Sequence, residues 1–255
     1  NRNEKKTIDL KKTIDLKKVI ESNFPIKCDY FIADLSKLNE VHEVADKLMK
    51  LEKPIDVVIH NAGLTLSKQK LTDEGYDFVF VVNYLSSFII NYKLMSKLKK
   101  QSGARIIMNN SEGHRFVPWG LRMDDLNWRK RPYSGLKAYG SAKLAQLLSM
   151  HILKEEFKGS NVTINSMHPG AVESETGKDN GLIYKWYKKN ILSKMLRPTN
   201  IASDSLYYLG VSKNMNGISG KFYSLTSEEI PSPPAWDIDE ARKLWNISKK
   251  LAKLI

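Results

Sequence analysis

Hydrophobic stretches of two kinds alternate along most of the chain. Short apolar runs predict buried strands, at 26–33, 57–59, 104–108 and 162–167. Longer stretches with apolar residues three or four positions apart predict helices, at 36–51, 72–100 and 136–157. Because strands that alternate with helices form crossover units, we expect an α/β fold with helices on both faces of a doubly wound parallel sheet.

Two further helices are predicted towards the ends of the sequence. The stretch 2–21 contains the hexapeptide Lys-Thr-Ile-Asp-Leu-Lys twice, at 6–11 and 12–17, and predicts a surface helix with a lysine-rich side. The stretch 237–253 predicts a closing helix. No composition shift marks a linker between these ends, so we expect one domain over residues 1–255.

Charge and cysteine content narrow the classes of function. The 255 residues include 41 basic and 28 acidic side chains, a formal net charge of +13. No zinc-finger spacing or RNA-binding aromatic motif accompanies this charge, so we expect no nucleic-acid partner and at most weak attraction to a membrane surface. The single Cys28 excludes an intrachain disulfide and suits the cytoplasm or the cytosolic face of an internal membrane.

Three tyrosines precede a lysine by four positions, in the pairs Tyr133/Lys137, Tyr139/Lys143 and Tyr184/Lys188. A lysine-rich chain with 11 tyrosines produces this spacing by accident about once, so the spacing alone decides nothing. Only Tyr139 lies near the start of a long predicted helix, where side chains four apart share a face. We therefore take Tyr139 and Lys143 as the pair that carries chemistry.

An ordered series of short motifs surrounds this pair, and it covers essentially the whole chain. The motifs are Asp34-Leu35-Ser36, Asn61-Ala62-Gly63, Val82-Asn83, Arg105-Ile106-Ile107 leading to Ser111, His168-Pro169-Gly170-Ala171-Val172, Ser219-Gly220-Lys221-Phe222 and Leu244-Trp245-Asn246. Together they resemble the short-chain dehydrogenases/reductases, most of all the retinol dehydrogenase and WW-domain oxidoreductase branch. The resemblance implies a Rossmann-type sheet and a nicotinamide-dependent oxidoreductase.

Four residues carry the chemistry that this resemblance implies. Tyr139 would be the acid/base, and the Lys143 ammonium would favour its phenolate form and lower a pKa that is otherwise near ~10. Ser111 would hydrogen-bond the substrate oxygen, and Asn83 would anchor a water that leads protons to Lys143. No metal ligand set is expected.

The resemblance also implies a set of cofactor contacts. Asp34 and Leu35 would receive the adenine, Asn61-Ala62-Gly63 would pass close to the adenosine ribose, and Tyr139 and Lys143 would hold the nicotinamide ribose. Arg2 would face a 2′-phosphate, which favours NADP(H) over NAD(H). The turn after the last core strand would meet the carboxamide; its residues are Pro169, Gly170, Val172 and Ser174.

The chain departs from the family pattern at three points. His60 stands where the family usually has Asn, and Asn110 replaces the neighbour of the catalytic serine. The glycine-rich turn that places a helix N-terminus on the cofactor diphosphate does not occur in the sequence. In the family order 3-2-1-4-5-6-7 this leaves the first strand-helix-strand unit missing, and we expect about 30–45 residues to precede Asn1.

Large apolar side chains in the segments around 116–128 and 182–187 favour a lipophilic aldehyde, ketone or alcohol as substrate, although they equally suit core packing or a dimer contact. Dimerisation through the helix 136–157 is common in the family, but the sequence does not indicate it. The alternatives are a catalytically silent binding or scaffold protein on the same fold and, ranked last, a basic nucleic-acid binder.

Overall fold

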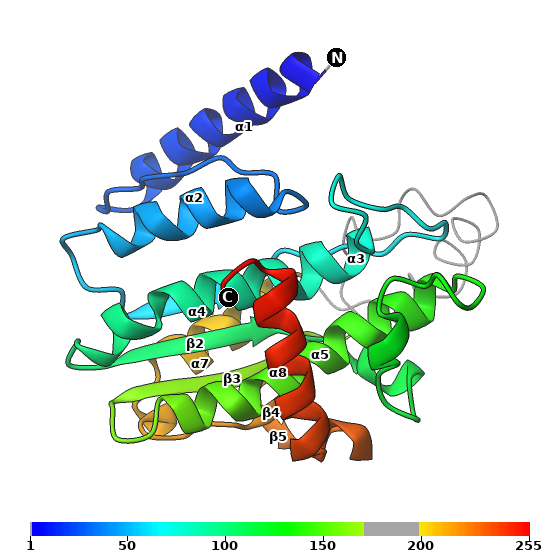
Figure 1. The fold of residues 1–255 in the computed structure, drawn as a ribbon. Coiled ribbons are helices and arrows are strands. Elements are labelled where there is room, and N and C mark those ends of the chain that lie inside the picture. Colours follow the sequence, from blue (N-terminus) through cyan, green and yellow to red (C-terminus); the bar gives the residue numbers. More distant parts are fainter. Residues whose placement is uncertain (1, 171–198) are drawn as a thin grey trace. The chain divides into compact units, whose positions relative to one another are not determined.

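The computed structural model describes residues 2–170 and 199–255, which form two compact units, Asn1–Asp34 and Leu35–Ile255 (Figure 1). The first unit consists of α1 (Arg2–Asn23) and an extended segment that folds back on it. The Cys28 N–H donates to Oε1 of Glu21 over 2.8 Å, and Nζ of Lys17 lies 3.7 Å from Oδ1 of Asp29. The helix predicted at 2–21 is confirmed.

The strand predicted at 26–33 is wrong. This segment is extended but irregular, and its apolar side chains Ile26, Phe31 and Ile32 are exposed rather than buried. An apolar run becomes a strand only where a neighbouring strand accepts its backbone hydrogen bonds. Among the residues that the structure describes, no strand pairs with this segment.

The second unit is built on a five-stranded sheet in the order β1-β2-β3-β4-β5. Its strands are β1 (Val57–His60), β2 (Ala104–Asn109), β3 (Val162–His168), β4 (Phe222–Ser224) and β5 (Ser227–Glu229). The first four are parallel, and β5 returns antiparallel to β4. The three strands predicted at 57–59, 104–108 and 162–167 are confirmed.

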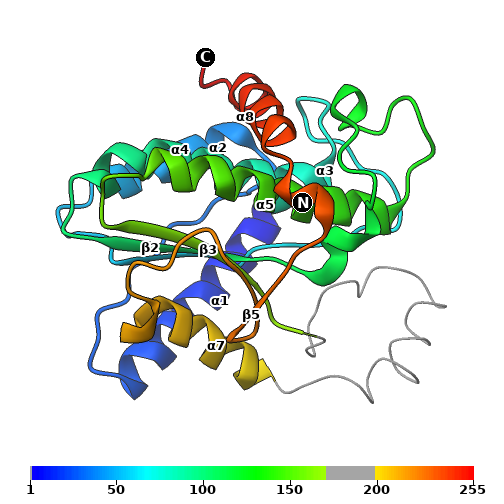
Figure 2. The same ribbon diagram turned by 90° about the horizontal axis from the view of Figure 1, so that it is seen from below.

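Helices cover both faces of this sheet, as the alternating pattern predicts (Figure 2). One face carries α2 (Leu38–Met49), α4 (Ser86–Lys99) and α5 (Gly135–Glu156), with α8 (Ile238–Leu251) packed on α5. The other face carries α7 (Thr199–Val211). Because successive side chains of a strand point to opposite faces, Ile106 joins the larger apolar core and Ile107 joins the smaller one beneath α7.

The helix predicted at 72–100 begins later than expected. Gly75 adopts a φ of +79°, and the Thr72 N–H donates to the Tyr76 carbonyl, so the residues before Asp77 form a turn. Asp77 then caps the helix by accepting from the Phe80 N–H over 2.8 Å. The run continues through α3 (Phe78–Phe80), a π-helical turn η1 (Val81–Leu85) and α4.

The helical run Phe78–Lys99 is long and apolar enough to cross a membrane by length and composition. In the fold, however, 72% of its most apolar window is buried. Its apolarity is explained by this burial, because a helix that contacts neighbours on most sides is hydrophobic all round.

Candidate active site

Parallel strands place their carboxyl ends at one edge of a sheet, and in open α/β folds that edge holds the ligand. Here Asn61 follows β1, Asn110 follows β2 and Pro169 follows β3. The start of α5 brings Tyr139 and Lys143 to the same edge, where the 3-10 turn η2 (Glu112–Phe116) contacts α5.

Lys143 is the buried charge of this site. Its side chain is 3% exposed, and its Nζ donates to the backbone carbonyl of Asn109 over 2.7 Å. Nζ also lies 5.6 Å from the centroid of the Tyr139 ring. Burial, which disfavours the ammonium, lowers the pKa of Lys143 from 10.5 to about 8.

Tyr139 and Ser111 meet across Gly113. A Cβ added to Gly113 would lie 2.7 Å from Cε1 of Tyr139 and 3.3 Å from Oγ of Ser111. The Ser111 hydroxyl accepts from the Gly113 N–H over 3.0 Å, which fixes its oxygen beside the ring. A Cβ at Gly140 would in turn lie 2.5 Å from the Gly113 carbonyl, so both glycines are needed for the close approach of η2 and α5.

Asn83 lies in the π-helical turn and is 1% exposed. Its side-chain amide is paired with the backbone of Leu64: Oδ1 accepts from the Leu64 N–H and Nδ2 donates to the Leu64 carbonyl, each over 2.8 Å. A Cβ added to Gly63 would lie 3.5 Å from Oδ1 of Asn83 and 3.7 Å from Nζ of Lys143. Asn83 therefore holds the Gly63 loop against Lys143.

His114 supports Ser111 from behind, and the sequence analysis did not identify it. Its Nε2 accepts from the Ser232 N–H over 3.0 Å, so the proton lies on Nδ1, which donates to the Ser111 carbonyl over 2.8 Å. Its side chain is fully buried, and burial lowers the pKa of His114. A histidine three residues after the serine was the available signal.

An ion-pair cluster borders the serine on the other side. Nη2 of Arg115 donates to Oε1 of Glu229 over 2.8 Å, and its Nε donates to Glu112. Nε2 of His168 lies 3.2 Å from Oε2 of Glu229 and 3.4 Å from Oε1 of Glu112. The cluster connects η2 with the ends of β3 and β5, and the single arginine pairs with both carboxylates.

The expected cofactor residues are placed in part. Asn61 accepts a hydrogen bond from the Asn109 side chain over 2.6 Å, and Ala62 and Gly63 are exposed at the carboxyl edge. Pro169 and Gly170, whose φ is +73°, continue from β3 at this edge. Val172 and Ser174 lie outside the described residues, and so does the aromatic segment around 182–187.

Of the residues expected on the adenine side, Asp34 and Leu35 fall at the boundary between the two units, and Arg2 does not. Arg2 begins α1, and Asp34 is the exposed last residue of the first unit. Leu35 begins the second unit and packs, partly buried, on its core. Their roles toward a cofactor therefore stay predictions.

His60, which stands where the family usually has Asn, contacts a helix. Its Nε2 lies 2.7 Å from Oδ1 of Asn91 on α4, and its ring is turned toward that helix. Burial lowers the pKa of His60. The substitution thus connects β1 to a helix.

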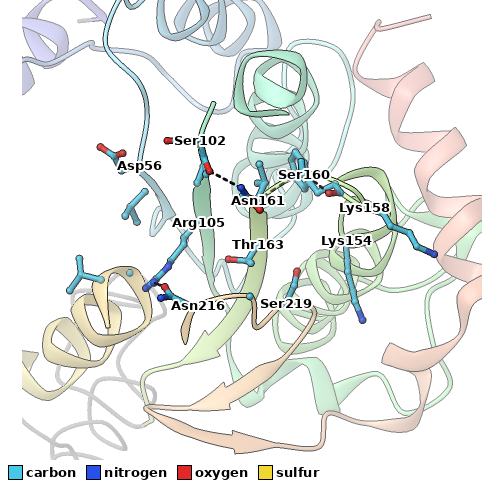
Figure 3. Close-up of a pocket in the computed structure, with 18 of the residues that line it drawn as sticks. Asp56, Ser102, Arg105, Lys154, Lys158, Ser160, Asn161, Thr163, Asn216 and Ser219 are labelled. Carbon is cyan, nitrogen blue, oxygen red and sulfur yellow. Dashed lines mark hydrogen bonds between the residues drawn. The ribbon is translucent and has the colours of Figure 1, made fainter. Parts of the chain in front are cut away.

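A separate hollow of about 710 Å³ lies at the amino-terminal ends of β2 and β3 (Figure 3). Arg105 enters it and donates to the Asn216 side chain over 2.6 Å, and the Asn161 amide donates to the Ser102 carbonyl over 3.0 Å. Because Tyr139 and Lys143 meet at the carboxyl edge, this hollow is not the candidate active site.

Comparison with known proteins shows which family the chain belongs to. Residues 8–120 match the family model described as short chain dehydrogenase. Human "Retinol dehydrogenase 13" is 32% identical over 225 residues, which are 87% of this chain and 67% of that protein. Human "Retinol dehydrogenase 14" is 30% identical, over 87% of this chain and 66% of that protein. The chain thus spans about two thirds of these relatives.

Solved structures share the fold. A protein from Mycobacterium paratuberculosis matches with a TM-score of 0.69 and 25% identity, covering 89% of this chain and 76% of that chain. The structure entitled "ElxO with NADP Bound" matches with a TM-score of 0.58 and 20% identity, covering 77% of this chain and 76% of that chain. The chain belongs to the short-chain dehydrogenase/reductase family, a family of oxidoreductases.

Proposed function

We propose that this protein is an NADP(H)-dependent oxidoreductase that interconverts a lipophilic alcohol and its aldehyde or ketone. The observation that carries the proposal is the convergence of three side chains at the carboxyl edge of the sheet. The Tyr139 ring and Ser111 Oγ both lie against Gly113. The buried Lys143 Nζ lies 5.6 Å from the centroid of the Tyr139 ring.

The residues at this edge fit the nicotinamide end of a dinucleotide. Gly63 offers no side chain where Lys143 and Asn83 approach it, and Gly170 turns the chain with a positive φ just after β3. When bound, the cofactor supplies or accepts the hydride. Lys143 would hold the ribose, whereas the glycine-rich turn for the diphosphate is not found in the sequence.

The protein's own residues move the proton. In reduction, the Tyr139 hydroxyl would donate its proton to the carbonyl oxygen while the Ser111 hydroxyl donates a hydrogen bond to the same oxygen. The Lys143 ammonium stabilises the resulting phenolate. The Asn83 backbone carbonyl accepts a hydrogen bond from Gln146. Because a carbonyl oxygen has two lone pairs, it can also accept from a water that returns a proton to Tyr139 through Lys143.

The lipophilic substrate and the preference for NADP(H) rest on the relatives. Two of them are named retinol dehydrogenases, and a structure of the same fold carries NADP in its title. The proposed 2′-phosphate contact at Arg2 agrees with that preference. Phe116 and the fully exposed Trp119 add apolar surface just after the catalytic serine.

Turnover and binding test the proposal together. The protein should oxidise NADPH in the presence of all-trans-retinaldehyde, followed by loss of nucleotide absorbance, and it should bind NADPH more tightly than NADH in titration calorimetry. Tyr139→Phe should abolish turnover and leave NADPH binding within a few-fold.

Tyr133→Phe is the matched control, because Tyr133 has the same spacing to a lysine but donates to the Leu66 carbonyl over 3.3 Å, away from Lys143. This variant should keep its turnover. Full activity in Tyr139→Phe would overturn the mechanism. Absence of both turnover and nucleotide binding in the wild-type protein would overturn the oxidoreductase proposal and favour a scaffold role.

We also propose that the protein is weakly attracted to anionic membrane surfaces, on the ground of its net charge of +13. It should sediment with phosphatidylserine vesicles at low salt and be released at high salt. Equal sedimentation with phosphatidylcholine vesicles would contradict an electrostatic attraction.

A further inference from the structure

Two buried side-chain amides connect the catalytic residues to one another. Asn110 is 3% exposed and Gln146 is 1% exposed. Nδ2 of Asn110 donates to the Lys143 carbonyl over 2.9 Å and to Oε1 of Gln146 over 3.0 Å, while its Oδ1 accepts from the Ser111 N–H over 2.7 Å. Nε2 of Gln146 donates to the Asn83 carbonyl over 2.8 Å. We name this chain of bonds the Asn110–Gln146 relay.

The relay joins three elements that each carry part of the site. Asn110 follows β2 and precedes Ser111, Gln146 lies one helical turn after Lys143 on α5, and Asn83 lies in the π-helical turn η1. In η1 the Ser86 N–H bonds to the Val81 carbonyl five residues earlier, and this wider turn lets a side chain reach a backbone carbonyl. The relay therefore fixes the spacing of β2, α5 and η1 at the site.

The relay also explains the departure at Asn110. A serine, which the family pattern has at this position, offers one hydroxyl proton. The two Nδ2 protons of asparagine serve the Lys143 carbonyl and Gln146 at the same time. Because both amides are buried and each bond fixes the orientation of the other amide, loss of one partner leaves the remaining groups unsatisfied.

We propose that Asn110 and Gln146 are coupled positioning residues that hold Lys143, Ser111 and Asn83 in register for proton transfer. This inference rests on the proposed function, because it assigns these two side chains a role in the same reaction. Neither amide touches the reacting atoms. They act through the three residues that they hold.

The principal variants are Gln146→Leu, which keeps the size of the side chain but removes its amide, and Asn110→Ser, which restores the family pattern. Each should lower kcat for NADPH-dependent reduction of all-trans-retinaldehyde by about 10- to 100-fold, the loss expected for a misplacement near 1 Å. The KM for NADPH should stay within about twofold. The double variant should be no worse than the worse single variant, because the relay acts as a unit.

The pH profile provides a readout that a merely structural role would not change. Displacement of Lys143 weakens the stabilisation of the Tyr139 phenolate, so the limb of the kcat profile that reports Tyr139 should move to higher pH in Gln146→Leu. Leu153→Ala is the matched control: it empties a fully buried position on the same helix but touches no relay residue. This control should lower Tm and leave kcat and its pH profile unchanged.

Hydrogen exchange separates a failure of this inference from a failure of the proposed function. The side-chain amide protons of Asn110 and Gln146 should be protected in the wild-type protein, and those of Asn110 should lose protection in Gln146→Leu. Unprotected amides, or additive losses in the double variant, would overturn the relay even in an active enzyme. A wild-type protein without turnover would overturn the proposed function whatever the amides show.

Discussion

Nζ of Lys143 donates to the backbone carbonyl of Asn109 over 2.7 Å, which anchors the buried ammonium to the carboxyl end of β2. This bond places the charge beside the tyrosine instead of in solvent. The burial of Lys143 lowers the stability of the fold, because burial disfavours the charged form of the side chain.

Lys143→Met should therefore remove activity and raise the free energy of unfolding. Lowering a pKa from 10.5 to about 8 corresponds to roughly 3 kcal/mol, from which the lost hydrogen bond to Asn109 subtracts about 1–2. We expect the variant to lose turnover and to unfold at neutral pH with a free energy higher by on the order of 1–2 kcal/mol.

The stability difference has a defined pH window. Below pH 8 Lys143 is charged in the folded and the unfolded chain, so the whole cost of its burial is present. Between pH 8 and 10.5 only the unfolded chain binds the proton, and the cost disappears as pH rises. Urea denaturation across this range should show the advantage of the variant shrinking, and a constant difference would contradict it.

Gly113→Ala should remove activity by displacing the Tyr139 ring. The new Cβ would lie 2.7 Å from the Tyr139 ring, so the ring must move away from Ser111. We expect kcat to fall at least about 100-fold, as for other misplacements of reacting groups. Gly210→Ala is the control. Gly210 lies on α7, and its new Cβ would be 3.4 Å from a Val57 methyl, an ordinary contact, so this variant should keep full turnover.

His114 should make the protein sensitive to acid. The pKa of His114 is lowered, mainly by burial. Below pH 6.5 the imidazole therefore binds a proton in the unfolded chain but stays neutral in the folded chain. The stability contribution of the neutral ring is therefore present above pH 6.5 and is lost as pH falls below that value. Arg115, Glu112 and His168 are the charged groups that modulate this titration.

His114→Gln tests this pH dependence. A glutamine can donate to the Ser111 carbonyl and accept from the Ser232 N–H as His114 does, but it does not titrate. The free energy of unfolding of the variant should fall less steeply between pH 6.5 and pH 5 than that of the wild-type protein. Equal slopes would show that His114 does not contribute, leaving His60 and His151, whose pKa values burial also lowers.

Trp128 and Trp119 should respond in opposite ways to truncation, although they lie in the same segment. Trp128 is 4% exposed and packs under the Arg131 guanidinium, 3.9 Å from the ring centroid, whereas Trp119 is 96% exposed. Trp128→Ala should cost about 3–5 kcal/mol, and Trp119→Ala should leave the unfolding midpoint unchanged. Thermal denaturation of the two variants distinguishes these outcomes; a stable Trp128→Ala would place Trp128 outside the core.

Local pattern was sufficient for much of the fold. The strands at 104–108 and 162–167 were predictable because a parallel strand covered on both faces is a continuous apolar run. The apolar run at 57–59 also forms a strand, although β1 is only half-buried and Ile59 is exposed. The helix at 136–157 followed from its apolar period. The same rule failed at 26–33, where an equally apolar run finds no partner strand among the described residues.

Strands β4 and β5 and helix α7 were not predicted. The two strands have three residues each, too few for a period to show, and β5 exposes polar side chains. They form because β4 pairs with Ser166–His168 of β3, a contact between distant parts of the chain.

The residues of the candidate site also fall into two groups, those predicted from the sequence and those that only the structure identified. Ser111, Tyr139 and Lys143 were predictable from sequence because a family resemblance gave their order, and the structure brings them to one edge of the sheet. Gln146 carries no such signal. Asn110 stood out only as a departure beside Ser111, and His114 only as a histidine three residues after it, because the role of each depends on contacts with distant residues.

The sequence by itself thus determined the fold class, three strands of the sheet and its long helices, because these follow from local pattern, and its motifs predicted which residues carry protons. Only the tertiary structure decided that Lys143 is buried, that Gly113 receives the tyrosine ring and that two amides connect the site. These depend on contacts between residues that are far apart in the chain, and a hydrogen bond or a desolvated charge exists only once those residues are packed together.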